Sequence, residues 1–206
     1  MVKDRILNKR QEGILELIVK SHIQSASPVG SGTVADHLGL SRATIRNVMS
    51  ELEEMGMIMH PHTSAGRIPT DNGYRYYLDS LMRIKRPNEE LTKTIEENYR
   101  HVMRSMESVM EATSSLISAL TKYVGITVVP QTAKVYLDGT SHILEQPEFR
   151  DFRKLYGIFR CLEDKDSILH VLCDENNDGS LLIYIGSENR LRYLDDCSVI
   201  TRGYRV

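Results

Sequence analysis

Five neighbouring side chains have the chemistry to recognise nucleotide bases, and their spacing would place them on one face of a helix. They are Ala43, Thr44, Arg46, Asn47 and Ser50. Arginine pairs with guanine and asparagine with adenine, and each good pair contributes about 1–3 kcal/mol of discrimination against a wrong base. A small apolar side chain such as that of Ala43 can contact the methyl group of thymine. The residues therefore predict a DNA-reading surface, with Thr44, Arg46 and Asn47 at the base edges.

The pattern around these residues predicts the helix that would present them. Ser41 is a favourable N-cap, because its hydroxyl can accept a hydrogen bond from an unpaired N–H of the first turn. Gly56 is placed to end the helix. Between these two residues an apolar stripe recurs at helical spacing and falls on the side opposite the polar face. Its members are Ile45, Val48, Met49 and Leu52.

The neighbouring segments complete the pattern of a winged helix-turn-helix. Residues 4–25 carry a wide apolar stripe, and a short helix with the sequence VADHL follows. After the predicted recognition helix come a short strand over 57–60 and the glycine-bearing loop PHTSAGRIP. In this architecture the second helix enters a major groove, and the wing contacts the backbone or minor groove beside it. We therefore expect a DNA-binding domain over residues 1–86.

Further polar side chains around this helix are candidates for contacts with DNA phosphates. Arg42 stands at its start, and Ser31 and Thr33 stand at the start of the preceding helix, where free N–H groups can hold a phosphate. Ordinary capping is an equally good interpretation of those hydroxyls. The helix after the loop adds Tyr74 and Arg75. Its three tyrosines also suit packing onto the domain, and we favour packing for at least two of them.

The predicted wing supplies a second set of candidates, which are His62, Thr63, Ser64 and Arg67. Gly66 would allow the backbone to approach DNA closely. Arg67 is the strongest candidate, and its replacement by alanine should weaken binding to all sequences about equally and reduce the salt dependence. The pair His60 and His62 also suggests zinc. Two histidines without a third ligand predict a metal site poorly, and we expect none.

Charge is distributed unevenly along the 206 residues, although the net charge is only −2. Residues 1–86 hold 12 Lys and Arg against 9 Asp and Glu, whereas residues 87–206 hold 14 against 19. A basic N-terminal part and an acidic C-terminal part suit a chain whose N-terminal part contacts DNA phosphates.

Several classes of protein find no support in the sequence. No apolar run approaches the ~20 residues of a membrane span, and the N-terminus has no secretory pattern. The three cysteines lack the spacing of a metal site, which favours a reducing, cytoplasmic setting. No catalytic triad, paired carboxylates or phosphate-binding glycine loop stands out. We therefore expect neither an enzyme nor a cofactor.

Beyond a basic segment that ends at Pro87, residues 88–123 predict one long helix with a heptad seam. Apolar-type residues recur there at alternating steps of four and three, the pattern by which helices pair. The partner would be the same helix of a second subunit, which we favour, or the C-terminal domain. Residues 87–124 thus form the expected linking and dimerisation helix. Its proposed dimer contacts are Ile95, Tyr99, Val102, Met106, Val109, Leu116 and Leu120.

The rest of the chain changes to short strands and helices. A helix with an aromatic-rich stripe is expected over 147–163. Strand patterns occur at 126–129, 134–137, 167–173, 181–185 and 197–206. Helices with a small, mostly antiparallel sheet give a second domain over 125–206. The expected fold class of the whole chain is therefore α+β.

Two blocks of the sequence, PVGSGTVADHLGLSRATIRNVMSELEEMGMI and PHTSAGRIPTDNGYRYYLD, resemble the bacterial HrcA family of heat-inducible transcription repressors. The run PHTSAGRIPTDNGYRYY is long and unusual, so this match is specific. Further on, VYLDGTSHILEQPEF and DDCSVITRGYRV are similar to the GAF-like C-terminal domain of that family. The resemblance implies a dimeric repressor of chaperone operons that binds an inverted-repeat operator. It also implies that the chaperonin GroEL keeps the repressor active.

One departure from the family concerns the dimer. Family members carry a sizeable inserted dimerisation segment before VYLDGTS, where this chain has only residues 130–133. The chain is either a natural short form or the product of a deletion, and either would shift the dimer contacts onto the 88–123 helix. Each would also leave the GAF-like domain truncated, without part of its sheet.

Two other functions are compatible with the residues. A ligand-sensing regulator of other genes would bind a small molecule in its C-terminal domain, and metabolites would then shift its thermal unfolding. A protein–protein adaptor would use the winged helix as a docking surface, and it would show no salt-dependent DNA binding.

Overall fold

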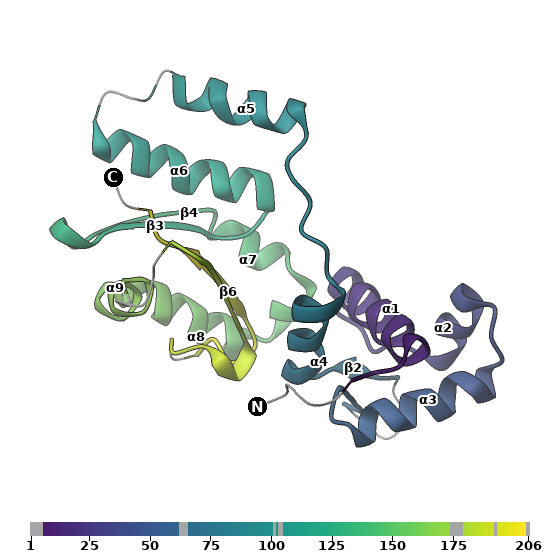
Figure 1. The fold of residues 1–206 in the computed structure, drawn as a ribbon. Helices are drawn as coiled ribbons and strands as arrows, with labels where there is room; N and C mark the ends of the chain where they lie inside the picture. The colour runs from purple at the N-terminus through teal and green to yellow at the C-terminus, as the bar shows by residue number, and fades with distance from the viewer. Residues whose placement is uncertain are drawn as a thin grey trace. The chain divides into compact units, whose positions relative to one another are not determined.

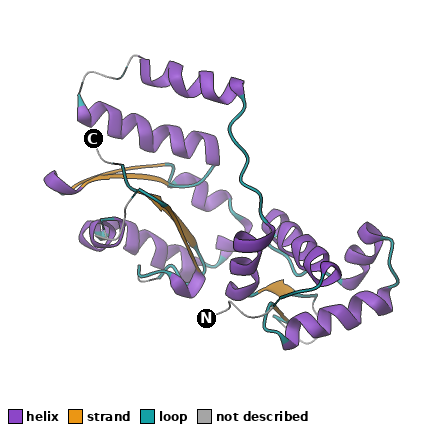
Figure 2. Ribbon diagram, viewed as in Figure 1, coloured by secondary structure: helices purple, strands orange, loops and turns teal. Residues whose placement is uncertain are grey.

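The chain divides into two units, Met1–Ile84 and Lys85–Val206, and each is described by itself. The structure is a computed structural model that describes residues 6–61, 66–100, 102, 105–173, 179–191 and 193–204. Figure 2 shows helices in both units, together with short antiparallel strand pairs. The fold class is α+β, as predicted.

The first unit consists of helices around two short strands. Its elements are α1 (Lys9–Ser25), α2 (Ser31–Leu38), α3 (Arg42–Glu54), β1 (Ile58–Met59), β2 (Ile68–Pro69), α4 (Asp71–Tyr76) and the π-helical turn η1 (Tyr77–Leu81). β1 and β2 are antiparallel, and Val29 adds an isolated bridge to Arg67. In Figure 1 a short turn joins α2 to α3, and both helices lie beside α1. This arrangement is the winged helix-turn-helix that the sequence predicts.

Apolar side chains of α1, α2, α3 and β1 form the core of this unit. Ile14 and Ile18 of α1 share the core with Ile45 and Leu52 of α3, and none of the four has exposed surface. A polar contact also joins the two helices, because the buried Gln11 donates a hydrogen bond to Glu51 Oε2 at 2.9 Å. The apolar stripe predicted for α3 is therefore the side by which that helix packs.

Tyr76 joins α4 to the start of α1. Its hydroxyl accepts a hydrogen bond from the Leu7 N–H at 3.3 Å and donates one to Glu12 at 3.1 Å. Burial raises the pKa of Tyr76, because the charged phenolate would lose hydration. This tyrosine has the packing role that the sequence analysis favoured.

The second unit combines small helices with two strand pairs. Its elements are α5 (Glu89–Arg100), α6 (Met106–Thr121), β3 (Gly125–Val129), η2 (Pro130–Thr132), β4 (Lys134–Asp138), α7 (Ser141–Glu145), η3 (Pro147–Arg150), α8 (Phe152–Glu163), α9 (Lys165–Leu172), β5 (Leu181–Ile185), η4 (Gly186–Glu188) and β6 (Ser198–Arg202). β3 pairs with β4 and β5 with β6, both antiparallel. A small core lies around Ile143, Ile158 and Cys161.

The segment predicted as one long helix is two helices, and that prediction is wrong. α5 ends at Arg100, and Ser105 is extended and caps α6 by accepting a hydrogen bond from the Ser108 N–H at 3.2 Å. Figure 1 shows α5 and α6 side by side. The hydroxyl of Tyr99, on the predicted seam, lies 2.7 Å from that of Thr113, which stands midway between the seam residues Val109 and Leu116. The seam therefore folds back and pairs partly with itself.

Small residues allow α6 to lie close against the β3–β4 pair. Ser114 is buried on α6, and a Cβ at Gly125 would lie only 2.1 Å from the Ser114 carbonyl oxygen. A four-residue loop, 130–133, joins the two strands so that Val129 is paired directly with Lys134. The hairpin is thus closed at the position where the sequence analysis noted the missing segment.

Two further elements differ from the prediction. Residues 167–173, expected as a strand, lie mostly in helix α9, because Asp164 caps that helix by accepting a hydrogen bond from the Ser167 N–H at 3.2 Å. The helix expected over 147–163 is a 3₁₀ turn followed by α8, with Asp151 extended between them as the cap of α8. In the part of the chain that the structure describes, no helix is long and apolar enough to cross a membrane.

Candidate nucleic-acid interface

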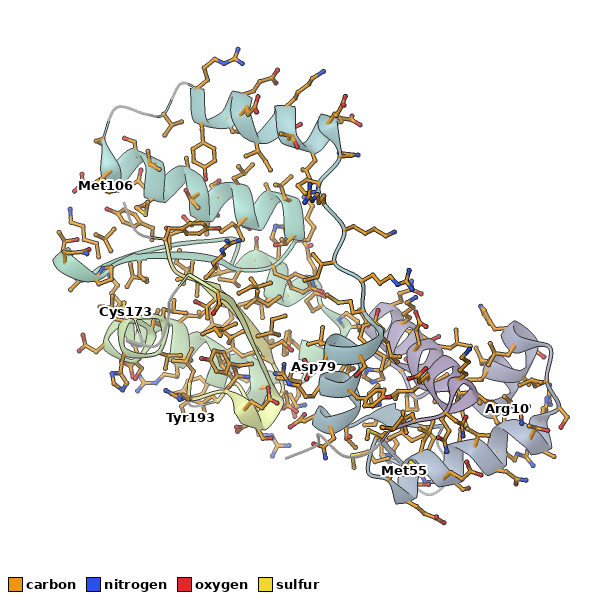
Figure 3. The ribbon with its side chains drawn as sticks, viewed as in Figure 1. Arg10, Met55, Asp79, Met106, Cys173 and Tyr193 are labelled. Carbon is orange, nitrogen blue, oxygen red and sulfur yellow. The ribbon has the colours of Figure 1, made fainter. Side chains whose placement is uncertain are left out.

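The outer face of α3 carries the residues predicted to recognise bases. Arg46, Asn47 and Ser50 are exposed, Ala43 is exposed near the start of the helix, and Thr44 is half-buried. Figure 3 shows side chains standing along the face of α3 that is turned away from α1. The apolar stripe on the opposite face is buried in the core. The polar face of α3 is therefore exposed, as it must be for the helix to enter a DNA groove.

A short turn sets the position of α3 relative to α2. Gly39 ends α2 with a φ of 65°, a left-handed conformation that glycine adopts without strain. Ser41 then caps α3, because its hydroxyl accepts a hydrogen bond from the Thr44 N–H at 3.1 Å. The Ser41 and Thr44 hydroxyls lie 2.8 Å apart. The Thr44 hydroxyl thus already has a hydrogen-bond partner, the N-cap residue Ser41, in the absence of DNA.

Two arginines of α3 lie beside the start of α2. The N-cap of α2 is Gly30, which offers no side-chain cap. Arg46 Nε donates a hydrogen bond to Ser31 Oγ at 3.4 Å, and a Cβ at Gly32 would lie 3.6 Å from the Arg42 guanidinium. Helix N-termini and guanidinium groups both favour phosphate. The structure therefore brings together three of the residues predicted at the DNA backbone or base edges, and Thr33 is exposed in the same first turn.

The wing candidates are described only in part. His62, Thr63 and Ser64 lie outside the described residues. Arg67 lies just before β2, and only 17% of its side chain is exposed. Its guanidinium contacts Glu53 Oε2 at 3.0 Å and donates to His60 Nε2. The side chain predicted to reach a phosphate is thus turned toward α3.

Glu53 was not among the residues singled out from the sequence, and His60 was considered there only as a possible zinc ligand. One signal could have found part of this contact, because a hairpin places residues at equal distances from its turn opposite each other. His60 follows β1 and Arg67 precedes β2. Nothing in the sequence pairs either residue with Glu53, because that contact depends on how the last turn of α3 packs.

The two candidates on α4 are engaged within the first unit. The Tyr74 hydroxyl lies 2.8 Å from His22 Nδ1, and Arg75 Nη1 lies 3.5 Å from Asp79 Oδ1. α4 packs against α1 and β2 rather than beside the exposed face of α3. The structure does not bring these two residues to the α3 face, and their contact with DNA stays a prediction.

Two other features concern metals and small ligands. Among the described residues, no group of three or more His, Cys, Asp or Glu side chains gathers as it would around a metal ion. The second unit has an open hollow of about 540 Å³ between α6 and β4. Its lining includes Glu111, Tyr136 and Asp138. This hollow is one place in the second unit where a small ligand could bind.

Two family profiles match the chain. The profile described as the winged helix-turn-helix transcription repressor, HrcA DNA-binding, matches residues 6–81, and the profile of the HrcA protein C terminal domain matches residues 86–206. Among solved structures, a crystal structure of a hypothetical protein at 2.2 Å resolution aligns with a TM-score of 0.70 at 19% identity. That alignment covers 97% of this chain and 87% of the other, and it supports the fold alone.

Curated relatives carry the name heat-inducible transcription repressor HrcA. The relative from Symbiobacterium thermophilum is 28% identical over 302 residues, covering 98% of this chain and 89% of the relative. The relative from Desulforudis audaxviator is 47% identical over 127 residues, covering 61% and 37%. Because the first alignment is 302 residues long and this chain has 206, roughly a third of the aligned positions have no counterpart here. The chain belongs to the HrcA family of heat-inducible transcription repressors.

Proposed function

We propose that this chain represses chaperone genes by binding an inverted-repeat operator as a homodimer in the cytoplasm. The recognition helix α3 would enter the major groove, with Thr44, Arg46 and Asn47 at base edges and Ala43 and Ser50 beside them. Arg42, Ser31 and Thr33 would hold phosphates of the adjoining backbone. The observation that carries this proposal is the exposed polar face of α3 beside the uncapped start of α2.

The chaperonin part of the proposal comes from the family resemblance. GroEL would keep the repressor active, and unfolded protein that accumulates in heat would draw the chaperonin away. The second unit is the candidate for that contact, because apolar side chains such as Phe152, Tyr156 and Ile200 are exposed on it.

A gel-shift titration against the inverted-repeat operator tests the proposal. The control duplex has the same composition in scrambled order, and both titrations are run with and without GroEL on protein of known mass in solution. We expect operator binding at least about 10³-fold tighter than binding to the scrambled duplex, as for typical specific complexes. Affinity should fall steeply with salt. Equal affinity for both duplexes, or binding that salt does not change, would contradict the proposal.

The proposed dimer contacts need revision, because the seam is divided between two helices. Tyr99 meets Thr113 within one unit, so it contributes less to a partner. Met106 and Leu120 remain 47% and 44% exposed, and Ile117 between them is 40% exposed. These three positions lie on one side of α6 at helical spacing. Thr113, which contacts α5, lies on the same side, so we place the dimer face on the part of this stripe that α5 leaves exposed.

Leu120→Asp should convert the dimer to a monomer, because the carboxylate would lose its hydration in an apolar interface. A monomer grips one half-site at a time, so operator affinity should fall about 100-fold. Light scattering and operator titrations measure the two effects. Ser115→Asp is the matched control, since Ser115 is exposed on another side of α6. A Leu120→Asp variant that keeps the parent's mass and affinity would move the dimer face elsewhere.

A ligand-sensing regulator is the second candidate function, and the hollow between α6 and β4 favours it. In that case a metabolite would change operator affinity without any chaperonin. Thermal-shift screening of metabolites, followed by operator titration with each hit, separates this function from the first.

A further inference from the structure

Three side chains from separate segments of the first unit meet at one point. They are Glu53 in the last turn of α3, His60 after β1 and Arg67 before β2, and we call them the wing clasp. Glu53 Oε1 lies 2.7 Å from His60 Nδ1, and Glu53 Oε2 lies 3.0 Å from Arg67 Nη2. Arg67 Nη1 also donates to His60 Nε2. Each member therefore contacts both of the others.

Hydrogen-bond chemistry sets the direction of each contact in the clasp. A guanidinium group has only donors, so His60 Nε2 is the acceptor in its contact with Arg67. His60 Nδ1 then donates to Glu53 Oε1. The carboxylate thus receives one hydrogen bond from His60 and one from Arg67. The arginine side chain is engaged on α3, and its Nε is buried without a partner among the described residues.

The backbone of Arg67 joins a fourth segment to the clasp. The Arg67 and Val29 peptide groups exchange two hydrogen bonds, at 2.8 and 2.9 Å. The approach is close, since a Cβ at Gly66 would lie 2.4 Å from the Val29 carbonyl oxygen. Val29 is followed by Gly30, the N-cap of α2. Arg67 therefore connects the start of α2, the end of α3 and the β1–β2 pair.

We infer that Arg67 is a positioning residue, which supports DNA binding through Glu53 and His60 rather than by contacting a phosphate. This inference rests on the proposed function. The clasp holds the segments around the recognition helix in one arrangement in the free protein. The entropy lost by ordering these segments on binding DNA is therefore smaller. A direct phosphate contact would require the mostly buried guanidinium to leave its carboxylate. The inference replaces the role in the wing that the sequence suggested for Arg67.

A charge swap separates the two roles of Arg67. Arg67→Glu and Glu53→Arg should each weaken operator binding about tenfold or more, because each places two like charges together. The double variant restores an ion pair with reversed polarity, and we expect its affinity within about threefold of the parent. If Arg67 faced a phosphate, a glutamate there would be repelled, and the swap could not restore binding. Glu54→Arg, an exposed neighbour with the same charge change, is the control.

A neutral pair keeps the test decisive if a swapped variant fails to fold. Arg67→Gln and Glu53→Gln should lower operator affinity by similar factors. Because both substitutions break the same contact, the double variant should bind the operator no less tightly than the single variant with the lower affinity. The slope of log affinity against log salt should stay that of the parent. A slope smaller by about one for Arg67→Gln, with additive losses, would assign Arg67 to a phosphate and overturn the inference.

The outcomes also distinguish the clasp from the proposed function. A parent chain that shows no salt-dependent operator binding would overturn both. A parent that binds the operator, with a folded swap variant no better than the single variants, would overturn the clasp alone.

Discussion

The double variant Arg46→Ala with Asn47→Ala should lose most of its preference for the operator while it keeps its fold. Both side chains are exposed on α3, so their truncation removes nothing from the core. Each paired base contributes about 1–3 kcal/mol of discrimination. The operator should therefore lose at least about 2 kcal/mol, or about 30-fold, relative to a scrambled duplex. Fluorescence anisotropy titrations of both duplexes at one salt concentration measure this ratio.

A control for the lost charge is available on α1. Lys20→Ala also removes one positive charge from the first unit, at an exposed position outside the reading face. It should leave the ratio of operator to scrambled affinity unchanged. If the double variant discriminated as well as the Lys20→Ala variant, the base-reading role of α3 would be wrong.

The second large effect is expected at Gly73, where alanine should destabilise the first unit by about 3 kcal/mol or more. A Cβ at this position would lie 2.0 Å from the Met57 carbonyl oxygen and 3.0 Å from its carbonyl carbon. Both atoms belong to the backbone, so no side chain can rotate away. α4 would have to move from the core. Hydrogen exchange of the α1 and α3 amides reports the opening of this unit alone, even in the full chain.

Gly13→Ala is the matched control for this substitution. Gly13 lies within α1, and a Cβ there would meet nothing within 4 Å. Alanine should therefore stabilise the helix by about 0.5–1 kcal/mol, the ordinary difference between the two residues. The two variants should change amide protection in opposite directions. If the α1 and α3 amides were equally protected from exchange in the Gly73→Ala and Gly13→Ala variants, the space around Gly73 would be larger than the structure indicates.

The recognition helix could be predicted from the sequence because its signals agree. A cap at Ser41, one apolar stripe and a polar face with little acid all indicate the same helix, and burial follows from the stripe. The four residues of that stripe are the ones buried. Periodicity is informative when the two faces of an element differ this much.

Other elements could not be predicted, because their patterns fit more than one structure. The heptad spacing over 88–123 is satisfied both by one long helix and by two helices that fold on each other, and the cap at Ser105 decides for the second. Residues 167–173 alternate well enough for a strand, yet the cap at Asp164 starts a helix. Caps are weak signals in a sequence, but they decide where two periodicities compete.

The exposed polar face of α3 was predictable for the same reason that the helix was, and the clasp was not. Arg67 could be recognised as a cation in the loop of a predicted wing. Its partner Glu53 could not, because the two lie 14 positions apart and meet only after the strands and α3 have packed. A charged residue in a loop suggests a ligand by default, and only tertiary structure shows that a neighbour already holds it.

The short loop between β3 and β4 makes this hairpin a natural point of entry for foreign sequence. Val129 and Lys134 are cross-strand partners, so their backbones leave the sheet side by side. A guest domain whose own ends lie within about 5.5 Å, the spacing of such partners, could be grafted there without shifting the strand register. The scaffold could thus carry a reporter or a new assembly module far along the chain from the helix that we propose reads DNA.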